Sequence, residues 1–223
     1  MTSPLPPAEL RARVLAAAIA EPMRPRAAGV GRSPLVVLAG FLPALALSLF
    51  VGGPGVGDRP AAYTAFLAVA WLAVAVLATV ASVSRGTSML GRPSSWRLAA
   101  AALTPATLLG TALVAMALWP SVAAGHAVLR DHAVCVVATL LCGLGPLASF
   151  AFVRRGSEPV LPRLTGAAIG AAAGAWGALF IELHCAHASW DHVVLGHLAP
   201  VALLTLVGVI VGDRVLAVRA AHD

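Results

Sequence analysis

Charged residues are scarce in this sequence, and their scarcity excludes most soluble folds. Only 11% of the 223 residues are charged, whereas 60% are hydrophobic, and all 15 basic residues are arginine. A soluble domain of this length would need far more charge to cover its surface. Aromatic residues make up only 5%, so the apolar character comes from a mixture of Ala, Leu and Val that favours helices. Because helices satisfy their own backbone hydrogen bonds in lipid, we expect an all-α membrane protein.

Motifs for catalysis are missing as well. The three cysteines, Cys135, Cys142 and Cys185, form no CxxC pair, so a zinc-finger or thioredoxin interpretation has no support. The sequence contains no P-loop, GxSxG, HExxH or glycine-rich nucleotide turn. Its net charge of +6 comes from arginines between apolar runs, which indicates membrane orientation rather than direct nucleic-acid binding. We therefore expect neither an enzyme nor a resident cofactor, with a transient metal ion as the one exception.

Six apolar segments are each long enough to cross a bilayer, which requires about 20 residues. They run roughly over residues 34–52, 60–83, 97–119, 132–153, 164–184 and 193–211. We expect a polytopic bundle of six transmembrane helices over residues 34–212. A cytoplasmic segment, residues 1–33, precedes it, and a cytoplasmic tail, residues 213–223, follows.

The arginines predict the orientation of these spans. With an even number of spans, most arginines fall on one side of the membrane, whereas Arg59 and Arg130 fall on the other. The first group comprises Arg11, Arg13, Arg24, Arg26, Arg32, Arg85, Arg92, Arg97, Arg154, Arg155, Arg163, Arg214 and Arg219. Because basic residues are retained on the cytoplasmic side, we expect both termini in the cytoplasm.

The N-terminal segment is the largest piece outside the predicted membrane domain. A helix is predicted over Pro7–Glu21, since proline suits the first helical turn and Glu9 and Arg13 can pair at i,i+4. Leu10 and Val14 belong to a narrow apolar stripe on this helix. A basic tether then leads into the first span.

Small residues are concentrated in the fifth span. Gly166, Gly170 and Gly174 repeat at i,i+4 and line one face of the predicted helix. Such faces let helix backbones approach closely. They indicate packing within the bundle, with a homodimer interface as the alternative.

Histidines, acids and cysteines gather at the predicted outer face. The set contains His126, His132, His184, His187, His192, His197, Asp131 and Asp191. Cys185 directly follows His184, and Cys135 lies about one turn into the fourth span. Imidazole and thiolate suit zinc, copper and other soft or borderline metals, and two outer cysteines could instead form a disulfide in an oxidising compartment. The alternative is that these residues are interfacial polar groups at helix ends.

Two further residues near this face have separate interpretations. Cys142 lies about 10 Å deeper along the helix than Cys135 and is expected to be a small buried apolar residue. Glu182 is an acid near the outer end of its span, where a carboxylate indicates function; the alternative is a neutral side chain that reaches to the membrane interface. We expect His184 or an adjacent histidine to be its partner.

The stretch from Cys135 to Val215 resembles the C-terminal half of NrsF-type proteins, the negative regulators of sigma F. The resemblance rests on features that occur in order along the chain. They are a cysteine early in the fourth span, Gly145-Pro146, the basic Arg154-Arg155, a Gly/Ala-rich fifth span ending Leu183-His184-Cys185, the outer Asp191, and a sixth span ending Gly212-Asp213-Arg214. The N-terminal Leu10-Arg11-Ala12-Arg13-Val14-Leu15 is similar to the short cytoplasmic lead of such regulators.

The resemblance implies a membrane anti-sigma factor of the bacterial inner membrane. Such a protein would hold an extracytoplasmic-function sigma factor away from RNA polymerase, and Leu10, Arg11, Arg13 and Val14 are expected to bind it. A signal at the outer face would release the partner. The expected sensing residues are Cys135, His184, Cys185 and His187, which would also be the ligands of any metal. The competing hypothesis is a small-solute or metal transporter or channel.

Overall fold

The computed structural model describes residues 9, 12, 16, 33–51, 60–84, 93–124, 127–155, 157 and 160–217. The chain divides into two units, Met1–Pro34 and Leu35–Asp223, and the second contains the helix bundle. In the first unit Glu9, Ala12 and Ala16 are helical. The expected partner-binding residues Leu10, Arg11, Arg13 and Val14 lie outside the described residues.

Five helices are long and apolar enough to cross a membrane. They are α4 (Ala61–Val83), α5 (Ser94–Leu118), α7 (Leu129–Val153), α8 (Pro162–His184) and a 27-residue helix, Trp190–Leu216. The last comprises α9 (Trp190–His192), a π-helical segment (Val193–Leu198), α10 (Ala199–Val211) and a second π-helical segment (Gly212–Leu216). A single turn, α6 (Pro120–Ala123), follows α5. An all-helical chain with membrane-length helices is thereby confirmed for the part of the chain that is described.

The first predicted span differs from the other five. It consists of two short helices, α2 (Ser33–Gly40) and α3 (Leu42–Val51), separated by a turn at Phe41. The Phe41 amide donates to the Leu38 carbonyl three residues back, which tightens the turn. Pro43 has no amide hydrogen, so the helical hydrogen-bond ladder is interrupted just after this turn.

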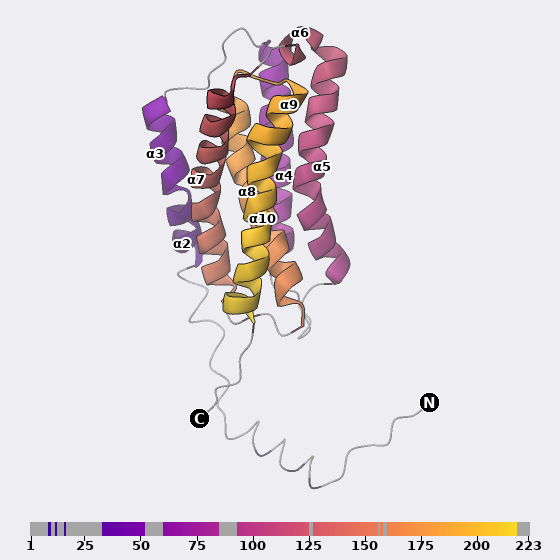
Figure 1. The fold of residues 1–223 in the computed structure, drawn as a ribbon. Helices are drawn as coiled ribbons and strands as arrows, with labels where there is room; N and C mark the ends of the chain where they lie inside the picture. Colours follow the sequence, from indigo (N-terminus) through magenta and orange to yellow (C-terminus); the bar gives the residue numbers. More distant parts are fainter. Residues whose placement is uncertain are drawn as a thin grey trace, which may run out of the picture. The chain divides into compact units, whose positions relative to one another are not determined.

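Helix α8 lies at the centre of the bundle and contacts α4, α5, α7 and α10 (Figure 1). It is built largely of Gly and Ala, and most of its residues are buried. Gly166 meets the backbone at Gly208 and Gly212, and Gly170 meets the backbone at Leu204. The glycine face of α8 therefore packs against α10 and the segment after it. This is packing within the bundle, the first of the two interpretations of the glycine repeat.

The bundle has two ends that differ in chemistry. We call the end where α8 stops and α9 begins the histidine end, and the end where α7 stops and α8 begins the arginine end. Figure 1 places the histidine end at the top and the arginine end at the bottom. At the arginine end, Arg154 is buried, and its Nη1 lies 3.4 Å from the Val83 carbonyl oxygen and 3.2 Å from that of Ser84. Arg154 thus satisfies carbonyls at the C-terminus of α4.

Replacing Gly170 with alanine is expected to destabilise the bundle by about 1–3 kcal/mol, because the added methyl group would overlap the backbone of α10. It would lie only 2.7 Å from Cα of Thr205. Gly110→Ala is the matched control, since nothing lies within 4 Å of a Cβ added there. The control should be neutral or gain up to about 1 kcal/mol of helix propensity. Thermal unfolding in detergent measures both, and equal melting temperatures would contradict the close α8–α10 packing.

Candidate functional site

Three elements place cysteine and histidine side chains together at the histidine end. Cys135 lies in the second turn of α7, and Cys185 directly follows the last residue of α8. His192 ends α9, and His197 lies in the π-helical segment that follows. All four side chains are buried. We call these four residues the thiol–imidazole cluster.

The two cysteines form the centre of the cluster. Their Sγ atoms are 3.5 Å apart, and both are free thiols. Cys185 Sγ also lies 3.1 Å from Nε2 of His192. Hydrogen bonds with Cys135 and then His192 lower the pKa of the Cys185 thiol below its ordinary value, and burial opposes this shift only in part. Thiolate is the form that attacks disulfides and binds metals, so the two contacting thiols form a candidate redox or metal-binding pair.

The four side chains form a candidate metal centre. One ligand atom from each residue can be chosen so that all lie within 4.8 Å of one another. A tetrahedral zinc site with bonds of about 2.0–2.3 Å needs ligand atoms roughly 3.3–3.8 Å apart, so a small contraction suffices. His197 Nε2 is buried and has no hydrogen-bond partner among the described residues. Two thiols and two imidazoles suit zinc, copper and other soft or borderline metals.

A second layer of side chains orients the imidazoles. His197 Nδ1 lies 2.6 Å from Oε1 of Glu182, and both side chains are almost fully buried. A carboxylate that accepts from Nδ1–H leaves the Nε2 lone pair free to face the cluster. His192 Nδ1 lies 2.9 Å from Nδ1 of His132, and the other ring nitrogen of His132, Nε2, lies 4.0 Å from Oδ2 of Asp191. Each imidazole of the cluster therefore has a polar partner behind it.

The structure separates the residues that the sequence grouped together. It brings Cys135 and Cys185 into contact, but the ring nitrogens of His184 and His187 interact elsewhere. His184 Nδ1 lies 2.8 Å from the Phe180 carbonyl oxygen, and its ring stacks on the Phe180 ring. His187 Nε2 lies 3.3 Å from Oδ2 of Asp131. His187 meets the cluster through its amide, which donates to Cys185 Sγ at 3.4 Å, and through its ring, whose centroid lies 5.3 Å from that of His192.

The imidazoles that the structure places beside the thiols belong to His192 and His197, which the sequence pattern does not single out as sensing residues. His192 and His197 were recognised only as outer-face residues. Their five-residue spacing does not put them on one face of a regular α-helix, which repeats every 3.6 residues. The π-helical segment that begins at Val193 changes this register and turns both toward Cys185. Glu182 pairs with His197, rather than with the neighbouring His184.

The sequence matches the family described as NrsF, negative regulator of sigma F, over residues 15–217. The match covers all five membrane-length helices and the whole thiol–imidazole cluster. No curated protein and no solved structure matches the chain.

Proposed function

The chain belongs to the NrsF family of negative regulators of sigma F, and on this premise we propose that it is a membrane anti-sigma factor for an extracytoplasmic-function sigma factor. The match over residues 15–217 is the observation that carries the proposal. A family of regulators is not a class of enzymes, and a negative regulator of a sigma factor has a sigma factor as its partner. Sequestration keeps that partner away from RNA polymerase until a signal releases it.

We further propose six spans in the bacterial inner membrane, with both termini in the cytoplasm. The pair α2–α3 supplies the additional span. Its 19 residues, Ser33–Val51, would extend about 28 Å if helical throughout, close to the roughly 30 Å of a bilayer core. Helix α3 packs against α7, so it belongs to the bundle. This topology assigns the arginine end to the cytoplasm and the histidine end to the periplasm.

A periplasm-specific reporter enzyme tests this topology. Fused after Asp223 it should be silent, and fused near Gly125 it should be active, because the arginine distribution predicts opposite sides for these positions. The paired cytoplasm-specific reporter should give the reverse pattern. Activity of the periplasmic reporter after Asp223 would contradict the proposed orientation.

The cytoplasmic segment 1–33 is the proposed holding surface for the sigma factor. Leu10 and Val14 would offer an apolar stripe, and Arg11 and Arg13 would contribute charge on neighbouring faces of the helix. The inner loops would complete the surface.

The thiol–imidazole cluster is the proposed sensor. Metal binding would draw the four ligand atoms closer together, and oxidation of Cys135 and Cys185 would shorten their 3.5 Å separation to a bond of about 2.05 Å. Either event pulls α7 toward the end of α8. These two helices are joined at the arginine end by the segment from Arg154 to Arg163, which gives the signal a direct route to the proposed cytoplasmic face.

Glu182→Gln is expected to weaken metal binding by about 10–100-fold, the usual effect of losing a carboxylate behind a ligand imidazole. The variant keeps the size of the side chain but removes the charge that orients His197. Competition with a chromophoric zinc or copper chelator measures the affinity of the reduced full chain in detergent. His184→Gln is the matched control and should retain the parental affinity. Equal affinity of the parent and Glu182→Gln would contradict the assigned ligand set.

Capture of a sigma factor by the intact chain tests the main proposal. Tagged chain co-produced with the sigma factors of its own bacterium should retain an extracytoplasmic-function member in detergent and silence a reporter transcribed by it. A thiol-reactive metal or oxidant should reverse both results. Retention of no sigma factor, together with an unaffected reporter, would overturn the proposal.

The transporter hypothesis has less support. A metal path would need ligands that continue beyond the cluster through the bundle. The buried polar side chains at mid-depth include Thr139 and Thr111, and their hydroxyls donate to backbone carbonyls of their own helices. The groups with metal-binding chemistry gather at one end, which fits a sensor better than a path.

A further inference from the structure

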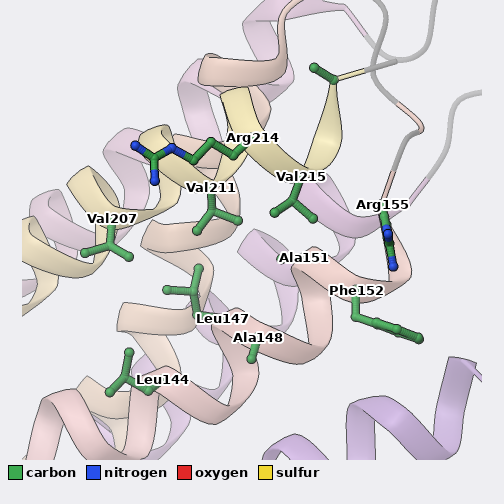
Figure 2. Close-up of a pocket in the computed structure, with 11 residues that line it drawn as sticks. Leu144, Leu147, Ala148, Ala151, Phe152, Arg155, Val207, Val211, Arg214 and Val215 are labelled. Atoms are coloured by element: carbon green, nitrogen blue, oxygen red, sulfur yellow. The ribbon is translucent and has the colours of Figure 1, made fainter. Parts of the chain in front are cut away.

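A second site lies at the arginine end, at the opposite end of the bundle from the thiol–imidazole cluster. A groove of about 710 Å³ runs between α7 and the helix Trp190–Leu216. Its walls are apolar and include Leu144, Leu147, Phe152, Val207 and Val211. Figure 2 shows these side chains along the two facing helices, with Leu144 and Val207 toward one end of the groove. The volume lies within the roughly 300–1,000 Å³ of ordinary ligand pockets.

The length of the groove matches one leaflet of a membrane. It extends from Leu144 in α7 to Arg155 just beyond the end of that helix, and these eleven residue steps correspond to about 16 Å of helix. Half of a roughly 30 Å hydrocarbon core is about 15 Å. An acyl chain lying along α7 would therefore reach from the bundle surface to the middle of the bilayer.

The charge in this groove comes from two arginines, and Figure 2 shows their guanidinium groups apart, with that of Arg214 on the side of Val207 and Val211. Arg155 follows the end of α7 and Arg214 lies in the second π-helical segment; both line the groove and both are exposed. Among the described residues neither guanidinium forms an ion pair with a carboxylate. The nearest acid in sequence to Arg214, Asp213, pairs with Arg163 at 2.6 Å. Two guanidinium groups with free hydrogen-bond donors suit a phosphate group.

We propose that this groove binds an anionic phospholipid, with Arg155 contacting the phosphate, Arg214 supplying a second positive charge along the groove, and one acyl chain lying between α7 and α10. Basic pockets between helices on the cytoplasmic side are the usual sites for acidic headgroups. The apolar walls favour a lipid over an acidic protein segment, because a water-soluble segment would have to enter the hydrocarbon layer to fill the groove down to Leu144. The proposal goes beyond sigma-factor binding and does not depend on it.

Lipid retention by the full chain tests the site. The chain is reconstituted in vesicles of equal parts phosphatidylcholine and phosphatidylglycerol, extracted in mild detergent, and weighed by native mass spectrometry. The parent should retain phosphatidylglycerol in preference to phosphatidylcholine. Each arginine should contribute about a fivefold preference, so Arg155→Gln with Arg214→Gln should lower it roughly 25-fold. Arg130→Gln, an exposed arginine at the histidine end, is the charge-matched control and should change nothing.

A second variant tests the acyl chain separately from the headgroup. Val211→Trp fills the groove midway while both arginines remain, and it should also abolish preferential retention. Unchanged retention in either variant would overturn the proposal, as would equal retention of the two lipids by the parent. Displacement of the lipid by a soluble polyglutamate peptide would identify an acidic protein segment as the occupant and would also overturn it. Size exclusion and thermal unfolding in detergent show whether the same variants remain folded.

Discussion

Cells carrying Cys135→Ser and Cys185→Ser together are expected to show no induction of the sigma-dependent promoter when they receive a thiol-reactive metal or an oxidant. The two Sγ atoms are in contact and supply half of the candidate ligand set. Serine is nearly the same size, but its hydroxyl neither forms a disulfide nor ionises at neutral pH. Promoter output should therefore remain at one fixed level, as measured by a transcriptional reporter before and after exposure.

Cys142→Ala is the matched control for this experiment. Cys142 is a third free and buried cysteine on the same helix as Cys135, but it does not belong to the cluster. Its replacement should leave induction intact, because it removes a thiol without touching the sensing pair. A normal response in the double serine variant would mean that the pair is structural and that the signal enters elsewhere.

Deleting residues 2–22 is expected to release the sigma factor and switch on its target promoters in the absence of any signal. This deletion removes the predicted helix with Leu10, Arg11, Arg13 and Val14, while the bundle from Leu35 onward remains. Promoter output should rise to the level seen in cells that lack the whole chain. The reporter used for the cysteine variants measures this, and capture of the sigma factor by the tagged variant provides a second readout.

Removal of residues 218–223 serves as the control for the N-terminal deletion. It shortens the other terminus and should leave the promoter silent. The full-length and shortened chains should behave alike on size exclusion in detergent, which shows that the bundle has formed. Undiminished capture of the sigma factor after deletion of residues 2–22 would place the binding surface in the inner loops.

The helices were predictable because a long apolar segment in lipid satisfies its backbone hydrogen bonds by forming an α-helix. All five membrane-length helices coincide with apolar segments identified in the sequence. The break at Phe41 was harder to foresee. A proline inside a span predicts a kink, but Pro105 and Pro146 lie within the continuous helices α5 and α7. Pro43 adjoins a break, but Gly143 precedes Pro146 by the same three residues as Gly40 precedes Pro43, and α7 is unbroken there, so the local sequence does not explain the break.

The site was predictable only in part, for a reason of helical geometry. Cys135 and Cys185 could be paired from their depth in neighbouring spans. His184 and His187 were predicted as sensing residues because they lie next to Cys185 in the sequence. At a helix end, however, consecutive side chains point in different directions, so these histidines need not face Cys135. His192 and His197 reach the thiols because the π-helical turn alters the direction in which successive side chains point.

The close backbone contact between α8 and α10 also governs how the bundle can move. Side chains that reorient between rotamers can absorb a small displacement, but Gly166 and Gly170 have none, and the surfaces that they meet are backbone. Rotation of one helix against the other would drive main-chain atoms into each other. The two helices should consequently behave as one stiff rod, so that a shift imposed at Cys185 arrives at Gly212 with little loss. α7 also approaches this rod closely through its backbone, at Thr139 beside Gly177 and at Gly143 beside Ala173, so the proposed sensor would act through a small displacement of α7.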